Sequence, residues 1–170
     1  PLVWMEAGYA GAYPYPTPGT VHGVLAGAAF YPRRYLVPVA QLGWMGVRHH
    51  ETSVGEVATS AFPIALSLRL SFPLGAALLG VGPLFRMDMT MVRIRPEGRD
   101  ATSKFDLNLV AGGMTTWNIP LPGNRLEAVM GASVAAVFLA DSHRIDNSTV
   151  LRGPTFEFLW YAGVTWQVSR

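Results

Sequence analysis

Apolar and polar side chains alternate with a period of two along five stretches of this chain. In the last and clearest stretch, the apolar side chains occupy every second position: Phe156, Phe158, Trp160, Ala162, Val164 and Trp166. Four earlier stretches repeat the alternation, within 64–72, 85–91, 105–117 and 126–138. Successive side chains of a β-strand point to opposite faces, so a period of two predicts amphipathic strands.

Three weaker strands are predicted at 3–13, 21–30 and 35–48, where small or apolar residues fall on both faces. The total is then eight, an even number of the kind that bacterial membrane barrels have. Tight turns at 32–34, 73–75 and 120–124 alternate with longer, more polar links at 14–20, 49–55, 95–101 and 141–153. This alternation is typical of periplasmic turns and extracellular loops, and it places both termini on the periplasmic side.

The composition favours a membrane protein that is not helical. Hydrophobic residues make up 50% of the 170 residues and charged residues 14%, against a usual charged share of about 25%. The longest charge-free runs, 70–85 and 107–124, are interrupted by proline and glycine and do not suit a spanning helix. A closed barrel is the other structure that satisfies its backbone inside lipid. We therefore expect an all-β fold, a transmembrane antiparallel up-and-down β-barrel, as a single domain over 1–170.

Location and partners follow from the same features. We expect a place in the bacterial outer membrane, with a secretory signal that has been removed or that precedes Pro1. The net charge of +2 comes from scattered arginines, and such a pattern does not indicate nucleic-acid binding. The expected partners are membrane lipid, lipopolysaccharide and other envelope proteins.

Some residues resist the simple pattern. Pro38, Pro63 and Pro83 fall within or near predicted strands, and they predict bulges or shorter strands. Trp4 shares a face with Glu6, so one of them should lie in the periplasmic mouth of the lumen, or the alternation should slip there. Aromatic residues are predicted to form two girdles at the membrane interfaces, a periplasmic one at Phe30, Tyr31, Tyr35, Phe72, Trp117 and Trp166, and an outer one at Tyr13, Tyr15, Trp44, Phe105, Phe138 and Phe156.

The segment from Phe158 to Trp166, with the sequence FLWYAGVTW, is similar to the final strand of small outer-membrane barrels. Over nearly its whole length, the chain resembles in pattern the family typified by the OmpA transmembrane domain, OmpX and OmpW-like proteins. This resemblance implies an eight-stranded barrel whose last strand is read by the barrel-assembly machinery. In that family the final residue is usually aromatic, whereas in this chain residues 167–170 follow Trp166.

Charged residues on the polar faces are the main candidate site. Both signs occur at two levels of the predicted lumen, with Glu6, Arg69 and Glu127 low and Arg86, Asp88, Lys104, Asp106 and Glu157 higher. An eight-stranded barrel is only just wide enough for side chains to fill it. Because buried charges persist only when they are paired, we expect these groups to plug the interior. A gated channel or a proton path is the alternative.

Other chemistry is weakly indicated. Asp141, Ser142 and His143 have the residue types of a hydrolytic triad, but three consecutive residues cannot converge, and the His-x-Ser pattern of lipid A deacylases is absent. His49, His50 and Glu51 point to alternating faces, which disfavours a metal site. We therefore expect neither an enzyme nor a cofactor.

Six arginines map near the outer rim, where guanidinium groups match phosphate geometry. They predict contact with lipopolysaccharide: Arg48, Arg93, Arg95, Arg99, Arg144 and Arg152.

Two functions follow. The first is a structural, anchoring or interaction subunit of the envelope with a plugged, charge-paired lumen. The alternative is a narrow channel or transport barrel for a small or apolar solute. A soluble lipocalin-like barrel would need an apolar interior and a polar exterior, and the charged faces of this chain are too narrow to cover an outside surface.

Overall fold

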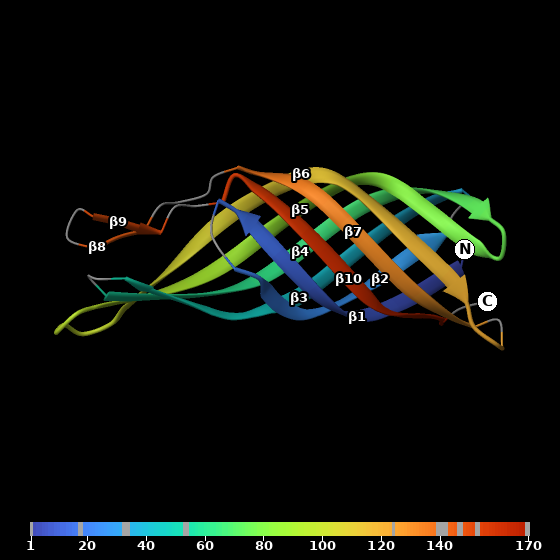
Figure 1. The fold of residues 1–170 in the computed structure, drawn as a ribbon. Coiled ribbons are helices and arrows are strands. Elements are labelled where there is room, and N and C mark those ends of the chain that lie inside the picture. The colour runs from blue at the N-terminus through green and yellow to red at the C-terminus, as the bar shows by residue number, and fades with distance from the viewer. Residues whose placement is uncertain are drawn as a thin grey trace.

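The computed structural model is a closed barrel of eight antiparallel strands (Figure 1). It describes residues 2–16, 19–31, 35–52, 55–123, 125–138, 143–145, 148–151 and 154–168. The strands, in chain order, are β1 (Leu2–Tyr15), β2 (Val21–Tyr31), β3 (Leu36–Thr52), β4 (Gly55–Leu74), β5 (Ala77–Pro96), β6 (Thr102–Pro120), β7 (Leu126–Phe138), β8 (His143–Ile145), β9 (Ser148–Leu151) and β10 (Phe156–Gln167). The predicted fold class is confirmed.

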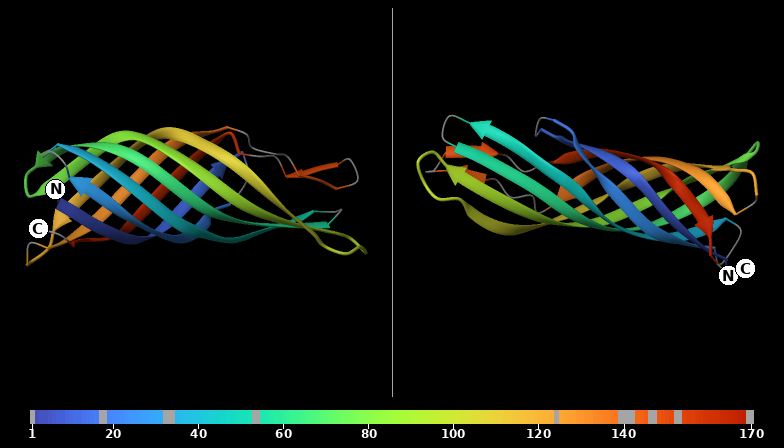
Figure 2. Two further views of the ribbon diagram at one scale, coloured as in Figure 1. Left: turned by 180° about the vertical axis from the view of Figure 1, so that it is seen from behind. Right: turned by 90° about the horizontal axis from the view of Figure 1, so that it is seen from below.

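Each barrel strand pairs with the next along the chain, and β10 closes the barrel against β1. The closing register runs from Trp4 opposite Gln167 to Tyr15 opposite Phe156. Both chain ends lie at one end of the barrel (Figures 1 and 2). We call this the turn end, because the short connections at Gly75 and Gly123 lie there, each glycine having a positive φ. The opposite end, which carries the β8–β9 hairpin, is called the loop end.

The strands β3 to β6 are longer than predicted. The segment 49–55, predicted as a polar loop, is largely strand, because β3 and β4 remain paired up to Thr52 opposite Gly55. Of the predicted loop 95–101, only Arg95 and Pro96 belong to β5, and β5 and β6 are paired up to Ile94 opposite Thr102. The polar composition of the β3–β4 tip suggested a loop. In water, however, two polar strands keep their backbone hydrogen bonds to each other as long as both remain extended. These four strands form an extension that projects beyond the rest of the barrel (Figure 2).

The prolines do not shorten the strands or shift their register. Pro38 lies opposite Leu68, Pro63 opposite Asp88 and Pro83 opposite Gly113, all in continuous register. A proline lacks one N–H and so can keep full pairing with only one of its neighbours. The expected bulge occurs elsewhere, between Met45 and Arg48 of β3.

The exterior of the barrel is apolar. Large apolar side chains face outward on every barrel strand, such as Leu66 and Phe85 with 60% and 62% of their surface exposed. Within the described residues, no helix is long and apolar enough to cross a membrane.

The predicted girdle residues are exposed, with the exception of Tyr31. This ring packs inward against Trp4 and the buried side chains of Ala29, Val37 and Val39. Tyr31 does not belong to the outer surface because its inward position follows the alternation of β2. The same cluster places Trp4 inside the barrel at the turn end.

Candidate functional site

The predicted lumen charges all lie on the inner face of the barrel or of its extension. Six of them are buried or nearly so: Glu6, Arg69, Arg86, Asp88, Glu127 and Glu157. They form two groups at different depths. Along β10, the inward positions run from Glu157 near the loop end, through Leu159 and Tyr161, to Thr165 near the turn end. The upper group surrounds Glu157, and the lower group lies around Thr165.

Arg86 is the centre of the upper group. Its Nε and Nη2 atoms donate to the two carboxylate oxygens of Asp88, each at 2.7 Å. Its Nη2 atom also lies 2.7 Å from Oε1 of Glu157, across the barrel interior from β10. One guanidinium therefore holds two carboxylates, and such forked, charge-assisted contacts are the strong ones.

The lower group is more loosely joined. Nη1 of Arg69 lies 3.5 Å from Oε2 of Glu6, and the amide of Gln41 donates to the other oxygen of Glu6. Glu127 accepts a hydrogen bond of 2.9 Å from the Asn118 amide. It also accepts one of 3.4 Å from the Thr165 hydroxyl.

An apolar layer separates the two groups. Its buried members come from all eight barrel strands: Ala10, Ala12, Leu25, Met45, Ala65, Leu84, Met114, Val129, Leu159 and Tyr161. A cavity of about 20 Å³ lies at this depth, with Arg86 and Gln41 among its lining residues. Such a volume is close to that of a single water molecule.

Two weaker polar pairs continue the inner face toward the loop end. Lys104 lies 3.2 Å from Asp106 on the same strand. The Asn108 amide donates to the hydroxyl of Thr90 at 3.2 Å. Lys104 is 40% exposed at its side chain, so this pair belongs to the wet extension and not to the closed interior.

The outer face of the extension carries a second polar group. Nδ1 of His49 lies 2.5 Å from Oε1 of Glu56, and both side chains are partly exposed. Beside them, Arg93 and Arg95 project from β5, and the four residues help to line a groove of about 400 Å³. In the described chain, no group of three or more His, Cys, Asp or Glu side chains could hold a metal ion.

The remaining rim arginines are dispersed. Arg48 faces the inside of the extension beside Gly19 of the β1–β2 connection, because the bulge in β3 reverses the alternation. Arg48 therefore does not share the outer face with Arg93 and Arg95. Burial on the inner side lowers the pKa of the neighbouring His50, and Arg48 and His49 lower it further.

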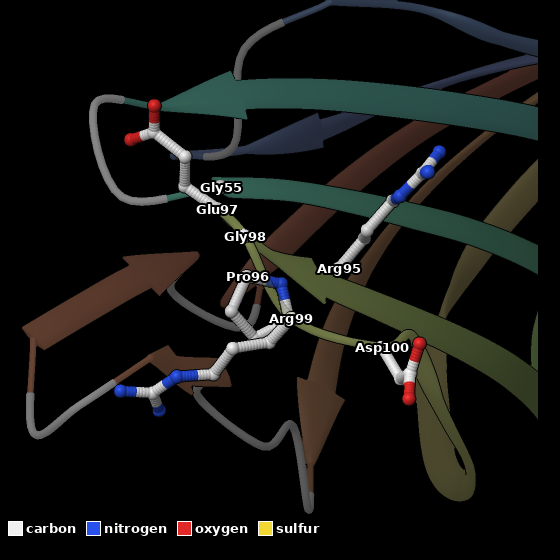
Figure 3. A pocket seen from close by; sticks show the side chains of 7 residues that line it. All are labelled: Gly55, Arg95, Pro96, Glu97, Gly98, Arg99 and Asp100. Carbon is white, nitrogen blue, oxygen red and sulfur yellow. The ribbon is translucent and has the colours of Figure 1, made fainter.

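Arg99 lies in the turn between β5 and β6, next to an open pocket of about 970 Å³ (Figure 3). In this view, the guanidinium groups of Arg95 and Arg99 point in opposite directions. The side chains of Arg144 and Arg152 lie outside the described residues, as do those of Asp141, Ser142 and His143.

Sequence reasoning missed the neutral partners of the lumen charges. Gln41, Asn118 and Thr165 each bond a buried carboxylate from another strand. They occupy inward positions of their strands, so the alternation alone could have identified them. Their particular carboxylate could not be identified, because it depends on how far neighbouring strands are staggered.

Comparison with known proteins gives no sequence relative. No protein-family model matches the chain, and no curated protein matches its sequence. Solved structures do match along nearly its full length. A major outer membrane protein from Thermus thermophilus aligns with a TM-score of 0.63 at 12% identity, covering 97% of this chain and 99% of that one. This chain has the fold of the small outer-membrane β-barrels.

Two more barrels align equally fully. Neisserial surface protein A has a TM-score of 0.61 at 12% identity, with 98% of this chain and 96% of that chain covered. The attachment invasion locus protein Ail of Yersinia pestis has a TM-score of 0.58 at 10% identity, with 98% and 97% covered. Together with the apolar exterior, this likeness identifies an outer-membrane-type barrel.

Proposed function

We propose that this chain is a barrel of the bacterial outer membrane with a plugged, charge-paired lumen. It acts as an anchoring or interaction subunit of the envelope, and it is not an enzyme. The turn end faces the periplasm and the loop end faces the outside. Contacts with lipopolysaccharide or with other envelope proteins are then made by the outer rim and the extension.

The observation that carries this proposal is the filling of the interior. Two groups of buried charged side chains, one centred on Arg86 and one that includes the Arg69–Glu6 pair, lie on either side of an apolar layer. The cavity at that layer measures about 20 Å³. An ion crossing the barrel would have to lose its water at the apolar layer and break the buried pairs, which costs several kcal/mol.

The exposed extension supports a role in external contacts. It continues four strands beyond the apolar band, and it carries the grooves beside Arg95 and Arg99. Ail, a barrel of the same fold, has been solved in complex with the heparin analogue sucrose octasulfate. A barrel of this shape can therefore hold an external anionic ligand, which fits an interaction subunit.

Planar-bilayer conductance tests the plugged lumen. The wild-type barrel is expected to give no steady, large conductance, since neither charged group leaves a continuous wet path. Arg86→Ala removes the centre of the upper group but not the apolar layer, so it should stay closed as well. Steady, large conductance in the wild type would refute the proposal.

The alternative of a narrow channel or transport barrel has one observation in its favour. In the lower group, Nε of Arg69 and Oγ of Ser67 are buried and bond to no other described residue. Such atoms could bond a passing polar solute. Conductance that is abolished by filling this region, for example with Ser67→Leu, would favour transport.

A further inference from the structure

Two arginines on the outer face of the extension form no ion pair with any carboxylate that the structure describes. Arg93 and Arg95 lie two residues apart on β5, and both are exposed. Neither forms an ion pair or a hydrogen bond with another residue that the structure describes. Because a strand rises about 3.3 Å per residue, their Cα atoms are about 7 Å apart on one face. Two guanidinium groups at this spacing can reach a single anion.

The arrangement of Glu56 explains why Arg95 is left unpaired. Glu56 lies directly opposite Arg95 in the pairing of β4 with β5. Cross-strand neighbours of opposite charge normally attract. In this barrel Oε1 of Glu56 is instead 2.5 Å from Nδ1 of His49, which comes from β3 on the other side. His49 therefore engages the carboxylate that lies opposite Arg95.

The groove below the arginines has a mixed lining, in which Thr59 and Ser60 lie beside apolar side chains. Val47, Ala58 and Met91 contribute to its lining, and its volume is about 400 Å³. Further down β5, Met89 and Phe85 continue the exposed apolar surface of the barrel. The groove thus lies at the border where the apolar band ends and charged side chains begin.

We propose that this groove binds the phosphorylated headgroup of an outer-leaflet lipid, with Arg93 and Arg95 bonding the phosphate. The adjoining carbon chain packs on Val47, Ala58 and Met91. Guanidinium groups match phosphate geometry and bind it with charge-assisted hydrogen bonds. This proposal makes the proposed function more specific and rests on it, since the site can meet an outer-leaflet lipid only if the loop end faces outward. The amphiphilic lining favours a lipid over a free phosphate, which would gain nothing from the apolar floor.

Lipid titration tests the site on the intact barrel in a non-ionic detergent, with native mass spectrometry as the readout. The probes are diphosphoryl lipid A, the same lipid with both phosphates removed, and inorganic phosphate. The wild type should prefer the phosphorylated lipid, and each arginine replaced by glutamine should weaken its binding about tenfold. Arg125→Gln is the matched control, because Arg125 is exposed at the turn end.

Two further variants test whether the contact between His49 and Glu56 keeps the arginines available. Glu56→Gln removes the negative charge opposite Arg95 and should tighten the binding of phosphorylated lipid. His49→Ala frees Glu56 to pair with Arg95 and should weaken it. Gel mobility before and after heating shows whether each variant has folded. If the Arg93→Gln, Arg95→Gln double variant does not fold, the two single variants are titrated with lipid instead.

Several outcomes would overturn the proposal. These are equal binding by the Arg93→Gln, Arg95→Gln double variant, equal loss in Arg125→Gln, or equal affinity for the dephosphorylated lipid. Displacement of the lipid by millimolar inorganic phosphate would indicate a free-anion site and would also overturn it. A conducting wild-type barrel would refute the plugged lumen without changing the lipid titration, so the two failures can be told apart.

Discussion

Replacing Arg86 with alanine should destabilise the barrel more than any comparable change in the lower group. The substitution removes three contacts of 2.7 Å and leaves Asp88 and Glu157 without their cation in a buried site. Breaking a buried ion pair in this way costs about 3 to 5 kcal/mol. Arg69 has a single carboxylate contact at 3.5 Å, so Arg69→Ala should cost about 1 to 3 kcal/mol.

Urea unfolding of the barrel in lipid vesicles measures these losses, followed by the fluorescence of its five tryptophans. Leu68→Ala is the control, because Leu68 faces outward and lipid can fill the space that the side chain leaves. Combining Arg86→Met with Asp88→Asn and Glu157→Gln should restore much of the stability, since no buried charge then remains unpaired. An Arg86→Ala barrel as stable as Leu68→Ala would refute the charge-paired interior.

Three other predictions concern topology and packing. The chain has no cysteine, so Asp100→Cys should be labelled by an impermeant thiol reagent on intact cells while Leu74→Cys stays protected, and the reverse would invert the orientation. Gly131→Ala should lower the free energy of unfolding by about 1 to 3 kcal/mol, because its new Cβ would lie 2.0 Å from the Tyr161 ring. Gly113→Ala is the control and should be neutral, because a Cβ there meets nothing within 4 Å. Equal unfolding midpoints for the two variants would contradict this packing. The detergent-extracted protein should show a β-type circular dichroism spectrum and a gel mobility that changes on boiling, and a helical spectrum would contradict the fold.

The fold could be predicted from the sequence because each barrel strand faces lipid on one side and side chains on the other. The alternation of Phe156 to Trp166, for example, corresponds to outward positions throughout β10. The lengths of β3 to β6 could not be predicted in the same way. Beyond the apolar band, both faces of a strand can be polar, so the alternation of apolar and polar residues disappears. The backbone hydrogen bonds between neighbouring strands nevertheless continue.

The sequence also predicted which charged residues face the interior of the barrel. It did not predict which of these residues contact one another. The Asp88 carboxylate lies two residues from Arg86 on one strand, so this pair was within reach of sequence reasoning. Glu157 reaches Arg86 from β10, a strand that is not a neighbour of β5. Contacts across the interior depend on the stagger of the whole barrel, which no local pattern records.

The bulge between Met45 and Arg48 has a consequence for how the length of β3 can vary. Before it, the inward residues of β3 are odd-numbered, and after it Arg48 and His50 turn inward while His49 turns outward toward Glu56. One inserted residue thus changes the inward positions of β3 from odd-numbered residues in the barrel to even-numbered residues in the extension. A one-residue deletion there would remove the bulge and leave Arg48 two residues after Met45, so Arg48 would stay on the inner face and His49 on the outer face. The length of β3 could therefore vary by one residue at this position without exchanging the inner and outer side chains of the extension.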